Sequence, residues 1–181
     1  MYVQNTFGFV TQTQLPAWAS VNAPLDRAKV SRDQGKNAQG RDVYIWELIP
    51  KSESFDAWTK LYAVYVERPL KPNVEGYAGG EIKRYDRACT SSYVQIFEEV
   101  TPDAALFVVF CGAYRNDPET GEVVLYHMQM RGDVLVKHYY HQRVPAYEAT
   151  AEGLTAGLPL PEQDIVEMYR TVAQLRLGDP E

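Results

Sequence analysis

The sequence predicts an α+β domain in which helices cover a mostly antiparallel sheet. Three observations indicate this class. Residues 93–147 hold successive β-rich runs joined by short turns, residues 161–178 have the spacing of an amphipathic helix, and aromatic residues are abundant, with thirteen tyrosines, six phenylalanines and three tryptophans. At 181 residues and 45% hydrophobic composition, the chain is long enough to bury about 70% of its unfolded surface in one core. We therefore expect a single domain over residues 1–181, with residues 43–178 as its core.

The first third of the chain alternates polar stretches with short apolar runs. Residues 26–42 are polar and punctuated by glycine, which predicts an exposed loop between two early strands. Residues 43–50 are β-rich and end at Pro50, as a strand followed by a turn does. Ser54 then has the properties of a helix N-cap, although residues 61–67 fit a strand equally well. The apolar face of the expected helix comprises Phe55, Trp58, Leu61, Tyr62 and Tyr65.

A loop and a short helix precede the main sheet. Residues 69–80 contain two prolines and three glycines, which predicts a loop. Ile82, Tyr85 and Cys89 follow at helical spacing, which predicts a short helix over residues 81–91. The strands of the expected antiparallel meander are residues 93–100, 105–114, 122–130 and 135–147.

The closing helix is the clearest one in the sequence. It follows a stretch of small residues at 149–163, for which we expect a loop. Glu162 and Asp164 come first and the arginines come later, which complements the helix dipole, and Gly178 ends the pattern. The residues expected to face the sheet are Ile165, Tyr169, Val172 and Leu175.

The three histidines lie close together in the expected meander. A two-residue turn at Gly132 and Asp133 pairs Arg131 with Val134 and places His127 opposite His138, about 5 Å apart at Cβ. Two imidazoles at that distance can share a metal ion, but His141 points to the other face and no third ligand follows from the sequence. We therefore expect cross-strand packing, with a metal site as the alternative. A turn at residues 131–132 would place His127 opposite Val136, so the two histidines would not face each other. The same turn accounts for the Arg-Gly-Asp tripeptide without an adhesion partner.

Cys89 and Cys111 allow two interpretations. They lie 22 residues apart and belong to no C-x-x-C pattern, so they form either one disulfide or two buried free thiols. A disulfide would stabilise the fold by about 3 kcal/mol. A thiol nucleophile at Cys111 is a further hypothesis, which a disulfide would eliminate.

Composition and motifs exclude several function classes. A net charge of −6 and a pI near 5.1, without a basic stripe, argue against a nucleic-acid partner. The sequence contains no run of about 18 apolar residues, so we expect no membrane span. No phosphate-binding loop, dinucleotide fingerprint, zinc-protease or esterase motif is present, so no cofactor is expected. The close carboxylates near strands, Glu98 with Glu99 and Glu119 with Glu122, are interpreted as solvated charges.

Two stretches carry a resemblance to a known family. In ELIPKSESFDAW, residues 47–58, a strand ends at a proline and is followed by a serine and a tryptophan. In the second, FVVFCG at residues 107–112 precedes Gly121, Gly132 and a tyrosine-rich strand with Arg143. Over residues 43–145 these pieces are similar to uncharacterised bacterial secreted proteins and lipoproteins. The order of elements resembles the PsbP-like fold, an α-β-α sandwich found in photosystem accessory proteins, a nuclear-import factor and adaptors that load type VI secretion effectors.

The resemblance implies a non-enzymatic accessory or binding domain of the bacterial cell envelope. The periplasm or the cell exterior would be its compartment, with the cytoplasm as the alternative because MYVQNTFGFV lacks the features of a secretory leader. We expect the partner to be a protein or a small apolar ligand, since tyrosine and tryptophan anchor interfaces. The alternative function is a small hydrolase or metal-dependent enzyme built on Cys111 or on His127 and His138. The aromatic residues expected at a binding surface are Trp18, Trp46, Tyr62, Tyr65, Tyr77, Tyr139 and Tyr140.

Overall fold

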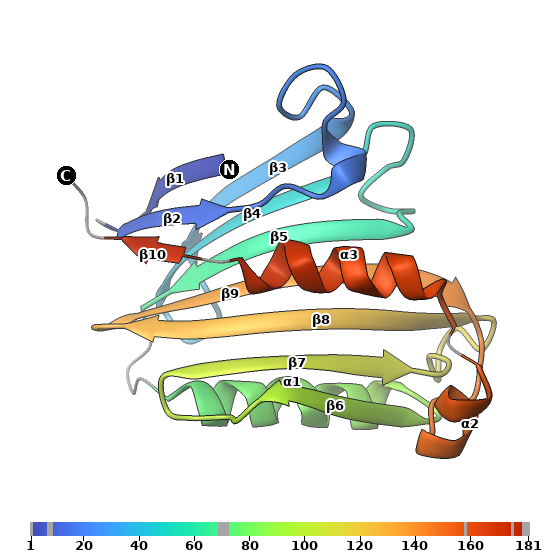
Figure 1. Ribbon diagram of the computed structural model, residues 1–181. Coiled ribbons are helices and arrows are strands. Elements are labelled where there is room, and N and C mark those ends of the chain that lie inside the picture. Colours follow the sequence, from blue (N-terminus) through green and yellow to red (C-terminus); the bar gives the residue numbers. More distant parts are fainter. Residues whose placement is uncertain (1, 7–8, 69–72, 158, 175, 179–181) are drawn as a thin grey trace.

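A seven-stranded antiparallel sheet with a helix on each face forms the centre of the protein in the computed structural model (Figure 1). The structure describes residues 2–6, 9–68, 73–157, 159–174 and 176–178. The strands are β1 (Tyr2–Thr6), β2 (Phe9–Thr13), β3 (Ala28–Lys36), β4 (Asp42–Pro50), β5 (Lys60–Glu67), β6 (Ser92–Glu98), β7 (Ala104–Cys111), β8 (Thr120–Arg131), β9 (Val134–Pro145) and β10 (Arg176–Gly178). The helices are α1 (Val74–Ala88), α2 (Ala151–Ala156) and α3 (Glu162–Ala173), with a 3-10 turn η1 at Ala17–Ala19.

The sheet order is β3-β4-β5-β9-β8-β7-β6, so β3 and β6 are its edges. Strands β6 to β9 form the expected meander, and β9 returns to pair with β5. The register of the β8–β9 hairpin is the predicted one, with Arg131 opposite Val134 and His127 opposite His138. Gly132 begins the turn with a φ of 59°, which a type II′ turn requires at its first central position. A separate three-stranded sheet, β1-β2-β10, joins the two ends of the described chain.

Side chains on both faces of the sheet are buried. Val108 and Phe110 of β7 point to the α3 side, where they pack in one core with Met168 of α3. Phe107 and Val109 alternate with them and point to the α1 side. The helices therefore cover opposite faces, and Figure 1 shows α3 in front of the sheet with α1 behind it. This arrangement is α+β with a mostly antiparallel sheet, as the sequence predicts.

Two predictions for the first third of the chain are wrong. Residues 26–42 are not a loop, because β3 pairs with β4 from Ala28 opposite Pro50 to Lys36 opposite Asp42. The polar residues of β3 gave it the composition of a loop. An edge strand tolerates such residues because it is largely exposed. The helix expected to begin at Ser54 does not form, and residues 60–67 are β5, the strand alternative for that stretch. Because β5 lies between β4 and β9 and is buried on both faces, its sequence lacks the alternation that identifies a strand.

The loop expected at residues 69–80 is wrong in its second half, where α1 begins. Asn73 caps this helix by accepting a hydrogen bond from the Gly76 amide. Val74 and Ala78 are buried against the sheet, and this packing overrides the low helix propensity of the glycines. Part of the small-residue stretch expected as a loop is the short helix α2.

The closing helix is confirmed over Glu162–Ala173 and ends before Gly178. Val172 is buried as expected, whereas Tyr169 is 36% exposed. Leu175 lies outside the described residues. Within the described part of the chain, no helix is long and apolar enough to cross a membrane.

Candidate functional site

The histidine pair holds the C-terminal end of α3. The Nδ1 atoms of His127 and His138 lie 3.1 Å and 3.0 Å from the carbonyl oxygen of Val172. A carbonyl oxygen only accepts, so both Nδ1 atoms carry a proton and donate it. The amide of Gln129 then donates to Nε2 of His127. In the described part of the chain no group of three or more metal-ligating side chains occurs. The contacts of the pair attach the end of a helix to the sheet.

This pair predicts acid sensitivity. Burial, together with the neighbouring His127, lowers the pKa of His138 from 6.5 to about 3. Since the folded state resists protonation, stability is full above pH 6.5 and is lost as the pH falls towards 3. Between pH 7 and pH 4.5 the contribution of His138 is about 2 to 3 kcal/mol. We expect urea unfolding to show that His138→Gln reduces the stability difference between these pH values by that amount. An unchanged difference would contradict the assignment.

Cys89 and Cys111 form a disulfide, the first of the two alternatives that the sequence allows. It joins the C-cap of α1 to the end of β7, and both cysteines are buried. No described cysteine is free, so the hypothesis of a thiol nucleophile at Cys111 is eliminated.

The seven expected surface aromatics do not form an exposed patch. Trp46, Tyr62 and Tyr140 are fully buried in the core on the α3 side, so their prediction as surface residues is wrong. They lie on strands whose two faces are both covered, which the sequence pattern does not reveal. The half-buried members of the set are Trp18, Tyr65, Tyr77 and Tyr139. Of these, Trp18 packs on the α3 side while Tyr77 and Tyr139 pack on the α1 side.

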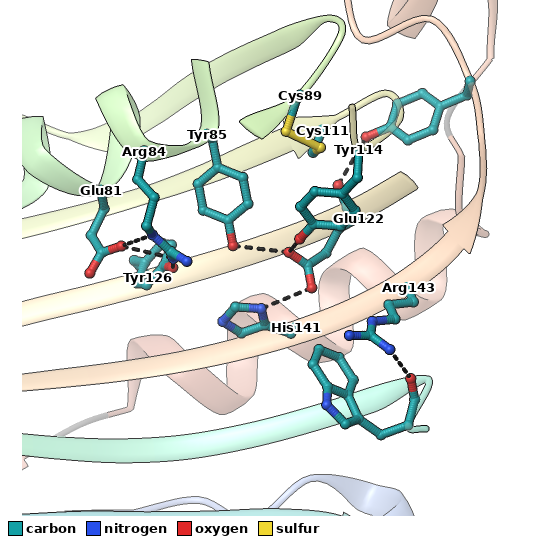
Figure 2. Close-up of polar contacts among 12 residues, drawn as sticks. Glu81, Arg84, Tyr85, Cys89, Cys111, Tyr114, Glu122, Tyr126, His141 and Arg143 are labelled. Carbon is teal, nitrogen blue, oxygen red and sulfur yellow. Dashed lines mark hydrogen bonds and ion pairs between the residues drawn. A yellow bond between two sulfur atoms is a disulfide. The ribbon is translucent and has the colours of Figure 1, made fainter. Parts of the chain in front are cut away.

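A buried carboxylate lies under the C-terminal half of α1 (Figure 2). Glu122 of β8 is 2% exposed, so its interpretation as a solvated charge is wrong, whereas Glu119 is exposed. Its Oε1 accepts a hydrogen bond from Nδ1 of His141 at 3.0 Å. Its Oε2 accepts from the hydroxyls of Tyr85, at 2.9 Å, and Tyr114.

The electrostatics of Glu122 follow from these contacts. Burial opposes ionisation, but His141 and the two tyrosine hydroxyls hold the pKa of Glu122 below its ordinary value. Burial and the carboxylate raise the pKa of Tyr114 in turn, so its hydroxyl remains a donor. The cluster therefore contains a carboxylate whose oxygens are both occupied by the protein's own donors.

Two further carboxylates attach α1 in the same way. The carboxylate of Glu67 accepts hydrogen bonds at 2.7 Å from Tyr65 and from Tyr77 of α1, and lies 2.7 Å from Nε of Arg41. In the middle of the helix, Glu81 pairs with Lys137 of β9 at 2.9 Å. Each carboxylate is directed to an internal partner. We interpret the three as the polar attachment of a glycine-containing helix, and not as an acid–base site.

An apolar groove opens on the other face of the sheet, between edge strand β6 and helices α2 and α3. Its volume is about 350 Å³. Phe97 lines it and packs on Tyr169 with ring centroids 5.2 Å apart, and these two side chains are 42% and 36% exposed. The residues that line this groove, called the β6–α3 groove below, are Tyr93, Gln95, Phe97, Val108, Phe110, Ala151, Leu154 and Ile165.

Local features of the sequence place the walls of the groove. The register of β6 on β7 shifts between Ile96 and Glu98, and the bulge lets Phe97 reach Tyr169 of α3. At the other end, a Cβ on Gly112 would lie 2.4 Å from the carbonyl oxygen of Tyr147. Only glycine permits this close approach, which sets the start of α2 against the sheet.

The sequence does not predict the groove, because its lining residues come from two segments, 93–110 and 151–165, that are 41 positions apart. The one local signal was the run QIFEE, residues 95–99, where two large apolar residues stand together without the alternation of a half-buried strand.

Comparison with known proteins gives a distant structural likeness. No family model and no curated protein matches the chain. A solved structure of the Saccharomyces cerevisiae Ran-binding protein Mog1p is similar to it, with 12% sequence identity and a TM-score of 0.43. The match covers 83% of this chain and 96% of that one.

Proposed function

We propose that this protein is a non-enzymatic binding domain whose β6–α3 groove receives apolar side chains of a protein partner. The observation that carries the proposal is the groove itself, since seven of its eight lining residues are apolar or aromatic and Phe97 and Tyr169 continue it onto the surface. Contiguous apolar surface on a folded domain marks interaction sites. Edge strand β6 leaves the groove continuous with the exterior, which suits a segment of a larger partner better than an enclosed small ligand.

The proposed compartment is the bacterial cell envelope. The buried disulfide between Cys89 and Cys111 supports it, because disulfides persist in oxidising compartments and are rare in the cytosol. The helices on opposite faces of the sheet agree with the PsbP-like sandwich that the family resemblance implies. We propose that fold name and that location together, since both come from the same resemblance.

An enzymatic role has no comparable support. Cys111 is held in the disulfide, and the Nδ1 atoms of His127 and His138 are both engaged by the carbonyl of Val172. We therefore do not propose a hydrolase or metal-dependent enzyme on these residues.

A peptide-display experiment tests the binding role. Peptides selected against the intact protein are expected to carry apolar residues. Filling the groove by Gln95→Trp should weaken their binding at least about tenfold, because the indole would occupy the space of a partner side chain. Gln34→Trp is the matched control, because Gln34 is equally exposed on the other edge strand, β3. If no peptide is enriched, or if enriched peptides bind both variants alike, the groove is not a binding site.

A further inference from the structure

We propose that the partner segment is cationic, with lysine or arginine beside the apolar residues that enter the β6–α3 groove. This inference rests on the proposed function and adds the chemistry of the partner. It starts from the distribution of charge along the chain. The groove walls come from residues 88–114, which contain β6 and β7, and residues 144–169, which contain α2 and most of α3.

These two segments contain no lysine, arginine or histidine, although the chain has 18 lysines and arginines. They contain eight carboxylates instead. Between these limits the groove walls supply only negative charge, and Arg170 of α3 follows the second segment directly. The eight residues are Glu98, Glu99, Asp103, Glu148, Glu152, Glu162, Asp164 and Glu167.

Two of these carboxylates directly follow groove-lining residues in the chain. Glu98 follows Phe97 and lies opposite Leu106, a residue of the core on the α3 side. Glu98 also contributes to the electrostatics of His127, which is on that side. Glu152 follows Ala151 in the first turn of α2, and both carboxylates are exposed. The apolar lining therefore has acidic side chains beside it at β6 and at α2.

This charge decides among the possible occupants. In a symmetric dimer formed through the groove, each patch would meet its own copy and place like charges together. Anionic lipid headgroups and nucleic-acid phosphates would be repelled in the same way. A protein segment with apolar residues flanked by cations satisfies both features, because carboxylates within about 8 Å act on it at physiological ionic strength.

Three synthetic peptides test the inference. Each has the same apolar core of leucine, phenylalanine and valine, flanked by two lysines, two serines or two glutamates at either end. Affinity for the intact, disulfide-bonded protein is measured by fluorescence anisotropy at low salt and in 0.5 M NaCl. We expect the lysine peptide to bind about tenfold more tightly than the serine peptide at low salt, with the glutamate peptide weakest, and we expect the difference to shrink to about threefold in high salt.

Charge variants assign the effect to the groove. Glu98→Gln with Glu152→Gln should weaken the lysine peptide about fivefold and leave the serine peptide within twofold. Asp33→Asn with Glu119→Gln removes two exposed carboxylates elsewhere and should change neither peptide more than twofold. If the control pair has the same effect, the attraction comes from the net charge of −6 and the inference fails.

The outcomes separate this inference from the proposed function. Equal binding of the lysine and serine peptides, abolished by Gln95→Trp, would overturn the cationic partner and leave the groove as a binding site. Absence of binding by all three peptides would overturn both. Sedimentation showing a dimer that Gln95→Trp dissociates, or flotation with vesicles of anionic phospholipid, would show another occupant and overturn the inference.

Discussion

Glu122→Gln is expected to lower the free energy of unfolding by about 1 to 3 kcal/mol, the range found when a buried hydrogen-bonding group is left without its partner. Glu122 is buried, and its two oxygens accept from His141, Tyr85 and Tyr114. A glutamine offers one acceptor and one donor group in the same space. Its amide would face a donor that it cannot satisfy, and an unsatisfied buried group retains its desolvation penalty. Urea unfolding at pH 7 measures the loss.

Glu119→Gln is the matched control for this variant. Glu119 lies three positions earlier and is exposed, so its replacement should change stability by less than about 0.5 kcal/mol. The pH dependence gives a second readout. Because the pKa of Glu122 is lowered on folding, its contribution is present above the ordinary value of 4.5 and is lost as the pH falls through the folded value. Equal stability of the two variants at pH 7 would contradict the account of the cluster.

The central hairpin was predictable from local chemistry alone. Gly132 and Asp133 mark a two-residue turn, and strict counting from that turn sets every cross-strand pair. This count places His127 opposite His138 and places His141 on the opposite face of the sheet. In the structure, Glu122 is the partner of His141 on that face. Counting residues from the turn does not show which elements cover each face of the sheet. Glu122 resembled a solvated charge because the sequence does not show that α1 covers its side of the sheet.

The groove and strand β3 were not predictable for a different reason. An edge strand such as β3 gains its hydrogen bonds from β4 without burying apolar side chains, so its sequence resembles a loop. The groove depends on β6 and α3 meeting through Phe97 and Tyr169, which are 72 positions apart in the sequence. Contacts of that kind come from tertiary packing, whereas periodicity reports only which side of its own element a residue faces.

Reducing the disulfide between Cys89 and Cys111 is expected to lower the free energy of unfolding by about 3 kcal/mol. The bond closes a chain segment of 22 residues, and that loop length gives about 3 kcal/mol on the chain-entropy model. The protein would be reduced under denaturing conditions and refolded, because both cysteines are buried. Cys89→Ala with Cys111→Ala is the control, since a reductant should not change the stability of this double variant. Equal stability of the oxidised and reduced wild-type protein would contradict the prediction.

Besides this global loss, reduction should loosen the C-terminal turn of α1 locally, although the disulfide is only one of several attachments of that helix. Tyr85 still binds Glu122, Glu81 still binds Lys137 and Tyr77 still binds Glu67 after reduction. The sheet should therefore stay folded while the C-terminal turn of α1 opens more often, since local opening follows the weakest set of contacts. Hydrogen exchange of the reduced protein should rise more at residues 85–88 than at the amides of β8 and β9, whose exchange rises only with the global loss of stability. Exchange that rises equally in α1 and in these central strands would show that the disulfide acts only on global unfolding and would contradict the local opening of the helix end.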